Sequence, residues 1–97
     1  MHTVVIKPSS LAPLTSLLLG EVFQEAGLPK GVVNIIPGSG SVVGDGLCNH
    51  PLVDKLSFTG STSVGTRVMQ NAACCIRSAS LELGGKSPAV ILKDADI

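Results

Sequence analysis

A carboxylate beside two glycines is the most chemically suggestive feature of this chain. Glu82 follows a short apolar run, and Gly84 and Gly85 come shortly after it in the segment LELGGKSP at 81–88. Paired glycines let a ligand approach the backbone closely, because no Cβ stands in the way. A carboxylate held beside such a turn could act as a general base near a flat cofactor or a thioester. The alternative, which spacing alone favours, is a strand-ending turn preceded by a solvated glutamate.

A second candidate is the segment FTGST at 58–62. Its pattern predicts a strand that turns on Gly60 into a helix, with hydroxyl side chains in the first helical turn. The free N–H groups and the positive dipole end at such a helix terminus bind anions. Equally, Ser61 or Thr62 could be an ordinary N-cap that serves only the helix.

Two weaker candidates lie earlier in the chain. Gly38, Gly40 and Gly44 follow a predicted strand and resemble a dinucleotide fingerprint whose last interval is one residue too long. We interpret this loop as lining a nucleotide rather than cradling its pyrophosphate. Lys7 ends the first predicted strand, where its ammonium group could reach a ribose hydroxyl or a phosphate. Taken alone, Lys7 would be interpreted as a solvated lysine at a strand end.

Strand and helix patterns alternate along the chain. Apolar and β-branched runs predict strands at 3–7, 32–36, 54–58, 79–82 and 88–92, and helical spacing predicts helices at 13–26, 42–49 and 64–75. This alternation predicts an α/β fold, with a Rossmann-like open, mostly parallel sheet and flanking helices. A Val- and Ile-rich chain with few aromatic residues fits strands buried on both faces. Because open α/β sheets bind ligands beyond the carboxyl ends of their strands, the candidate segments lie where a site is expected.

Length and charge exclude several classes of protein. The 97 residues allow one small domain or a piece of a larger one, and both ends look cut, so we expect an internal slice. A formal net charge of zero without any basic run argues against nucleic-acid binding. The apolar runs are too short to span a membrane. The first residues do not resemble a signal peptide, which predicts a cytoplasmic, intracellular protein.

The cysteines and histidines predict no metal site. Cys48, Cys74 and Cys75 are odd in number and show no CxxC spacing, so we expect reduced thiols. We expect Cys48 and at least one of the adjacent pair to pack as small apolar residues. A reactive role for one of the three is the less favoured alternative. His2 and His50 have no partner at a metal-ligand interval.

Four segments together carry a resemblance to a known family. They are IKPS at 6–9, GLPKGVVN at 27–34, FTGSTSVG at 58–65 and LELGGKSP at 81–88. In this order and spacing the chain resembles the NAD(P)-dependent aldehyde dehydrogenase superfamily over nearly its whole length. The resemblance implies that residues 1–97 are part of the dinucleotide-binding domain, with the catalytic cysteine domain and the oligomerisation segment absent. It also implies NAD or NADP as cofactor, an aldehyde as substrate and a homo-oligomeric intact enzyme.

The resemblance also implies a role for each matching residue. Glu82 matches the general base that activates the attacking thiol or the water that hydrolyses the thioester. The family's reaction is attack of a cysteine thiolate on the aldehyde, hydride transfer to NAD(P)+ and hydrolysis of the acyl-enzyme. The implied cofactor contacts are Lys7 and Ser9 at the adenosine ribose, Gly38 and Gly40 near the adenine, Gly60 and Ser61 at the pyrophosphate, and Leu83 and Gly84 beside the nicotinamide.

The chain departs from the family pattern in two ways. The nucleophilic cysteine of the family lies a few tens of residues past Glu82 and the oxyanion-binding asparagine lies before Met1, so these 97 residues alone are expected to be inactive. Many NAD-preferring members carry a glutamate where this chain has Ser10. Because a carboxylate there would repel a 2′-phosphate, Ser10 predicts that NADP is tolerated. The alternative function is a non-catalytic truncated relative that binds nucleotide or pairs with a full-length subunit.

Overall fold

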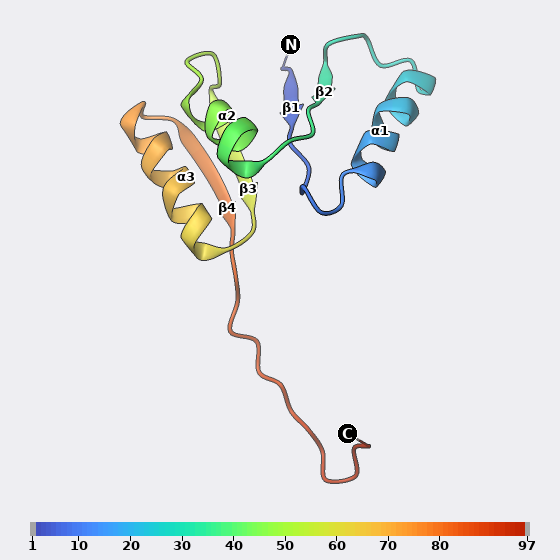
Figure 1. Cartoon of the computed structure of the whole chain (residues 1–97), viewed down its shortest axis with the longest axis vertical. Helices are drawn as coiled ribbons and strands as arrows, with labels where there is room; N and C mark the ends of the chain where they lie inside the picture. Colours follow the sequence, from blue (N-terminus) through green and yellow to red (C-terminus); the bar gives the residue numbers. More distant parts are fainter. Residues whose placement is uncertain (1, 97) are drawn as a thin grey trace. The chain divides into compact units, whose positions relative to one another are not determined.

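A computed structural model describes residues 2–96 of the chain. The chain divides into two compact units, Met1–Val53 and Asp54–Ile97, and each is described by itself. The elements in chain order (Figure 1) are strand β1 (Val4–Ile6), helix α1 (Leu14–Glu25), strand β2 (Val33–Ile35), the π-helical turn η1 (Gly40–Gly44), helix α2 (Asp45–Asn49), strand β3 (Lys55–Thr59), helix α3 (Thr62–Cys74) and strand β4 (Ser78–Glu82).

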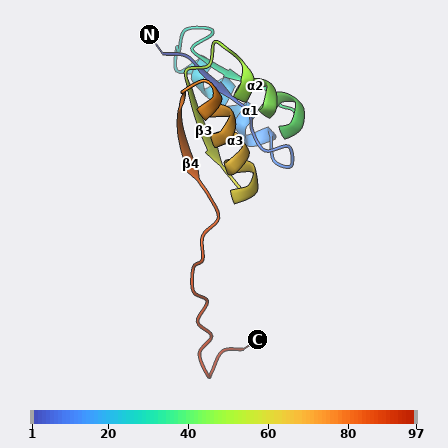
Figure 2. The ribbon, with the colours of Figure 1, turned by 90° about the vertical axis from the view of Figure 1, so that its left-hand side faces the viewer.

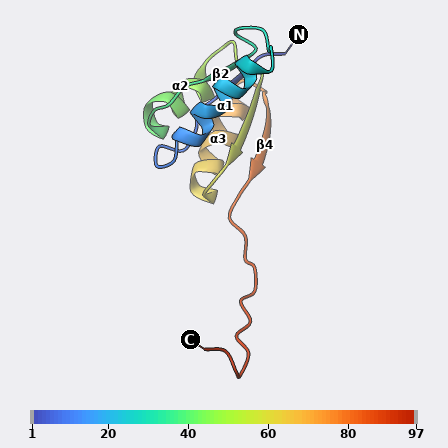
Figure 3. The ribbon, with the colours of Figure 1, turned by 90° about the vertical axis from the view of Figure 1, so that its right-hand side faces the viewer.

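Each unit contains one parallel strand pair joined through a helix. In the first unit β1 pairs with β2 in parallel and α1 lies between them in the chain, packed on β2 (Figure 3). In the second unit β3 pairs with β4 in parallel and α3 covers the pair (Figure 2). A parallel pair needs such a crossover, which is why these strands are separated by helices. The predicted α/β class with parallel strands is confirmed.

The second unit has one covered sheet face. Leu56 and Phe58 alternate with exposed residues along β3, and their partners across the ladder are Ala79 and Leu81 on β4. These residues share a face because side chains alternate along a strand. Of this unit's described residues, the buried hydrophobic ones are Leu56, Val68 and Ala72. The expectation that the strands are buried on both faces is therefore not met by β3 and β4.

The strand expected at 88–92 does not form. Residues 83–96 contain no strand, and they leave the end of β4 as an extended segment (Figure 1). Val90, Ile91 and Leu92 are between 67% and 80% exposed. β-propensity only describes side chains that fit a paired, half-buried surface, and no described strand pairs with this stretch. The five-strand prediction is wrong for this chain, whose described residues form two sheets of two strands each.

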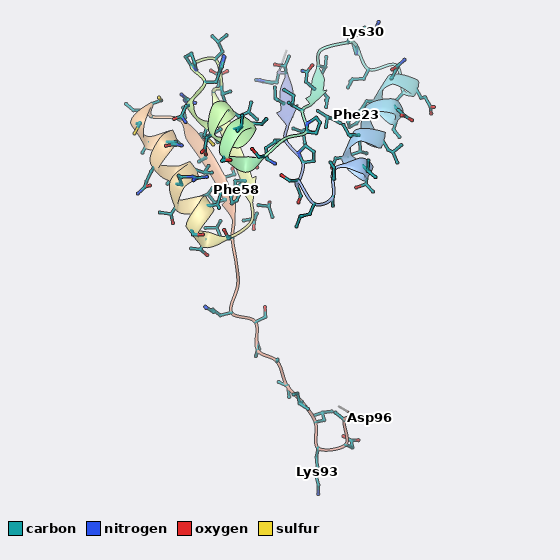
Figure 4. The ribbon with its side chains drawn as sticks, viewed as in Figure 1. Phe23, Lys30, Phe58, Lys93 and Asp96 are labelled. Atoms are coloured by element: carbon teal, nitrogen blue, oxygen red, sulfur yellow. The ribbon has the colours of Figure 1, made fainter. Side chains whose placement is uncertain are left out.

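Helix α1 ends on a glycine, as the sequence predicts. Gly27 has φ of 76°, a conformation that glycine adopts without steric cost. The backbone N–H of Gly27 donates to the backbone carbonyl of Gln24 at 3.1 Å, and the N–H of Leu28 donates to the carbonyl of Phe23 at 2.9 Å. Phe23 is labelled on this helix in Figure 4. These two bonds form a Schellman cap that satisfies carbonyls at the helix end.

Helix α3 ends with the same hydrogen bonds but without a glycine. The backbone N–H of Ile76 donates to the carbonyl of Ala73 at 3.1 Å, and the N–H of Arg77 donates to the carbonyl of Ala72 at 2.9 Å. Ile76 occupies the glycine position of the cap with φ of 53°, and it is 96% exposed. A β-branched residue in this region is strained by its Cβ substituents.

Replacing Ile76 with glycine is therefore expected to stabilise the full-length protein by about 1 kcal/mol, because it removes the left-handed penalty and loses almost no packing. Chemical denaturation of the variant measures this. Ile76→Ala, which keeps a Cβ, is the control and should gain much less. A Gly variant less stable than the wild type would contradict the strain argument.

The cysteines only partly match expectation. Cys48 on α2 is buried, as expected, whereas Cys74 and Cys75 are both exposed, so the expectation for the adjacent pair is wrong. They stand at the end of α3, beyond Val68 and Ala72 that face the sheet. Among residues 2–96, no three His, Cys, Asp or Glu side chains gather where they could hold a metal ion. Over the same range, no helix combines the length and apolar character needed to cross a membrane.

Candidate functional site

In the second unit, the ends of two strands bring together residues that the sequence places far apart. Thr59 at the end of β3 pairs with Glu82 at the end of β4. The backbone N–H of Gly60 donates to the carbonyl of Glu82 at 3.0 Å. Parallel strands end at the same edge of a sheet, and that edge is where α/β folds bind ligands. Gly60 and Glu82, predicted separately, therefore lie side by side.

The start of α3 adds a capped helix terminus to this edge. Ser61 is the N-cap, and its hydroxyl accepts a hydrogen bond from the Val64 N–H at 3.4 Å. The same hydroxyl lies 3.2 Å from that of Ser63. In this structure Ser61 thus performs the ordinary capping role that the sequence left open. The helix it caps is 13 residues long, so its positive dipole end also favours an anion at this edge.

Gly60 lies in close contact with an aromatic ring. A Cβ on Gly60 would lie 2.6 Å from Cζ of Phe58, a half-buried residue labelled in Figure 4. The turn from β3 into α3 therefore passes close to the Phe58 ring, which would have to shift to accommodate any side chain at position 60.

The residues after β4 lie over the first turns of α3. Leu83 packs on Gly65, where an added Cβ would lie 3.1 Å from Leu83 Cδ1 and 3.3 Å from its Cγ. A Cβ on Gly84 would lie 3.8 Å from Oγ1 of Thr62. The structure therefore unites the candidate residues of this unit, which are Gly60, Ser61, Glu82, Leu83 and Gly84.

Glu82 presents a free carboxylate at this edge. It occupies an outward position in the alternating pattern of β4, and its side chain is exposed. Its carbonyl is held by Gly60, while within residues 2–96 no hydrogen bond or ion pair engages its carboxylate. The main chain is thus fixed and the carboxylate remains available to accept a proton.

In the first unit, Lys7, Ser10 and Gly38 come together. The Lys7 ammonium donates to the carbonyl of Pro8 and, at 3.3 Å, to that of Gly38. The Ser10 hydroxyl donates to the same Gly38 carbonyl at 3.1 Å. A Cβ on Gly38 would collide with the side chain of Val43, so glycine is needed for this close packing. The end of β1 and the loop after β2 therefore form one cluster.

Ser9 and Gly40 are not drawn into this cluster by a described contact. The Ser9 hydroxyl accepts a hydrogen bond from the Leu11 N–H at 3.3 Å. Gly40 begins η1, and a Cβ added there would meet nothing within 4 Å. Both side-chain positions are exposed. They remain predictions as cofactor contacts.

Sequence reasoning missed two residues that shape these clusters. Ser39 caps η1, and its hydroxyl accepts a hydrogen bond from the Val42 N–H at 3.2 Å. A serine just before a helical pattern could have indicated this cap. Gly65 is buried on α3; it ends the segment at 58–65 but was given no role of its own, and its further signal is its spacing with Val68 and Ala72 on one helix face.

Comparison with known proteins identifies the family. The family described as "Aldehyde dehydrogenase family" matches residues 2–97. The chain is 55% identical over 97 residues to cytosolic 10-formyltetrahydrofolate dehydrogenase of Mus musculus, covering 99% of this chain and 11% of that protein. It is 52% identical over 93 residues to aminoaldehyde dehydrogenase 1, peroxisomal, of Pisum sativum, covering 96% of this chain and 18% of that protein.

Solved structures agree with these relatives. The NAD+ complex of aldehyde dehydrogenase from Bacillus cereus shares 49% identity with a TM-score of 0.87, over 97% of this chain and 19% of that one. A structure described as an E. coli NADP dependent enzyme shares 49% identity with a TM-score of 0.83, over 86% of this chain and 17% of that one. The chain thus spans a fifth or less of each of these relatives. The match covers nearly every residue described, and this chain belongs to the aldehyde dehydrogenase family.

Proposed function

We propose that these 97 residues are part of the dinucleotide-binding domain of a longer enzyme that oxidises an aldehyde to a carboxylic acid with NAD+ or NADP+. The observation that carries the proposal is the hydrogen bond from Gly60 to the Glu82 carbonyl, which ties a candidate base to a candidate phosphate site. Two similar structures, one described as an NAD+ complex and the other as an NADP dependent enzyme, support the choice of cofactor.

In this proposal each unit, taken by itself, carries residues assigned to dinucleotide contacts. The α3 terminus at Gly60 and Ser61 suits the pyrophosphate, because capped helix N-termini bind phosphate through backbone N–H groups and the dipole. Leu83 and Gly84 would lie beside the nicotinamide. In the first unit Lys7 and Ser9 would contact the ribose, and Gly38 and Gly40 would line the adenine.

The residues present fit such a cofactor. The Lys7 ammonium already donates to two carbonyls, so it can exchange one of these bonds for a ribose hydroxyl. Gly84 has no Cβ at the position where a planar ring would have to approach the backbone. The bound dinucleotide supplies the hydride acceptor of the reaction.

The chemistry assigned to this chain is proton transfer by Glu82. Its exposed carboxylate would take a proton from the attacking thiol or from the water that hydrolyses the thioester. The thiol itself would come from a part of the enzyme outside these 97 residues. A cytoplasmic homo-oligomer is part of the proposal, and the name of the cytosolic mouse relative supports the location.

Substitutions at Ser10 test whether the protein binds a dinucleotide and whether it tolerates NADP+. In the full-length protein we expect saturable binding of both NAD+ and NADP+, because no carboxylate at position 10 repels a 2′-phosphate. Ser10→Glu is expected to weaken NADP+ binding by about a hundredfold and to leave NAD+ binding nearly unchanged, since juxtaposed like charges cost several kcal/mol. Calorimetric titration with each dinucleotide measures both affinities.

The matched control for this test is Ser10→Gln. Like the glutamate variant, it loses the hydroxyl that donates to Gly38, but it adds no charge. NADP+ affinity should therefore survive in Ser10→Gln. Failure of the wild type to bind either dinucleotide would contradict the proposed function. A wild type that uses NAD+ about a hundredfold better than NADP+ would contradict only the tolerance assigned to Ser10.

A further inference from the structure

We infer that Gly65 is a positioning residue for Glu82, acting through the contact between Leu83 and the bare backbone of α3. This inference rests on the proposed function of Glu82 as the general base. It adds a residue that lies on a different element from the base. Gly65 occupies an interior position of a helix, where alanine is ordinarily the more favourable residue.

The segment that carries the base is held from two sides. On the strand side, the Gly60 N–H holds the Glu82 carbonyl at 3.0 Å. On the helix side, Leu83 lies against buried Gly65, at distances that leave no room for a Cβ. Glu82 shares a peptide bond with Leu83, so the place of the Leu83 side chain limits where the Glu82 carboxylate can lie.

The glycine is unfavourable for the helix that contains it. Gly65 lies inside α3, where glycine is less favourable than alanine because of its backbone entropy. An alanine would strengthen α3 but would force at least two carbons of Leu83 to move away. Since 38% of Leu83 is exposed, its side chain has space to move outward, and it would then lose its packing on α3. The contact with Leu83 is therefore what favours glycine at this position.

A small displacement of the base is expected to have a large kinetic effect. Misplacing a catalytic group by about 1 Å can cost about a hundredfold in rate. In Gly65→Ala we therefore expect kcat to fall by up to about a hundredfold, while the thermal midpoint stays near that of the wild type. A role limited to packing α3 on the sheet would instead lower the midpoint and act independently of Glu82.

The test is a double-mutant cycle in the full-length enzyme. The variants are Gly65→Ala, Glu82→Gln and their combination, with kcat, cofactor affinity and thermal midpoint measured for each. If Gly65 acts through Glu82, adding Gly65→Ala to Glu82→Gln should lower kcat little further, because coupled residues are not additive. Gly65→Ala/Leu83→Ala should lose little more activity than either single variant, because both changes remove the same contact. The control is Gly46→Ala on α2, where a Cβ meets nothing within 4 Å.

The outcomes separate failure of the inference about Gly65 from failure of the proposed role of Glu82 as general base. A Gly65→Ala enzyme with wild-type kcat, or one whose loss adds fully to that of Glu82→Gln, would overturn the inference alone. A Glu82→Gln enzyme with wild-type kcat would overturn the proposed base and the inference with it. Should Gly65→Ala fail to fold, the cycle is run with Leu83→Ala, which opens the same contact from the other side. Additivity of Leu83→Ala with Glu82→Gln would then overturn the inference.

Discussion

Replacing Glu82 with glutamine is expected to lower kcat of the full-length protein by about a thousandfold, within the range that general bases contribute. Glutamine keeps the shape of the side chain but cannot accept the proton of a thiol or water. The Glu82 carbonyl, which Gly60 holds, is unchanged by this substitution, so the strand ends and the start of α3 should stay in place. Cofactor affinity should therefore remain nearly that of the wild type. Steady-state kinetics and a calorimetric cofactor titration on the same preparation measure both quantities.

The matched control is Glu25→Gln, which makes the same chemical change at the exposed end of α1. It should alter neither turnover nor binding. Equal loss of turnover and of cofactor affinity in Glu82→Gln would assign Glu82 a structural role instead.

The isolated 97-residue chain is expected to aggregate or to unfold over a broad temperature range. Among residues 2–96 the buried hydrophobic residues are Cys48, Leu56, Val68 and Ala72, which is a small core for two units. Helix α1 contains no buried residue, although most of its side chains are apolar. Exposed apolar faces and unpaired strand edges favour association over folding. Circular dichroism melting together with light scattering on the purified chain tests this expectation.

A sharp, cooperative and reversible transition of a monomer would contradict it. The comparison to make is with the full-length protein under the same buffer conditions. There the same residues are expected to resist unfolding, because the remaining four fifths or more of the relatives' length would cover these faces.

Local signals in the sequence were enough to place the helices and strands that form. The helix predicted at 13–26 is α1, because its apolar spacing and the terminating Gly27 both depend on neighbours in the chain. The strands predicted near 3–7, 32–36, 54–58 and 79–82 all form, with ends that differ by at most one residue. The helix predicted at 42–49 is a π-helical turn followed by a short α-helix.

What sequence could not predict depends on contacts between distant segments. The run at 88–92 has the composition of a strand, but a strand needs a partner and the described chain provides none for it. The exposure of Cys74 and Cys75 depends on how far the buried face of α3 extends. The role of Gly65 depends on Leu83, eighteen positions later in the numbering, and no local pattern records that contact.

The candidate site was partly predictable because fold topology places it. Parallel strands end at one edge, so Gly60 and Glu82 were expected near each other once both strands were assigned. The cluster of Lys7, Ser10 and Gly38 depends on side-chain hydrogen bonds across a loop, which spacing does not predict. The roles of these residues toward a dinucleotide stay predictions.

One comparison tests the central claim most directly, namely that Glu82 serves an aldehyde oxidation beside a bound dinucleotide. The full-length wild type and its Glu82→Gln variant are each given an aldehyde with NAD+ or NADP+, and the carboxylic acid and the reduced nicotinamide are both quantified. We expect equal amounts of the two products from the wild type, and about a thousandfold slower formation of both by a variant that still binds the dinucleotide. A wild type that forms neither product, or a variant as fast as the wild type, would contradict the account.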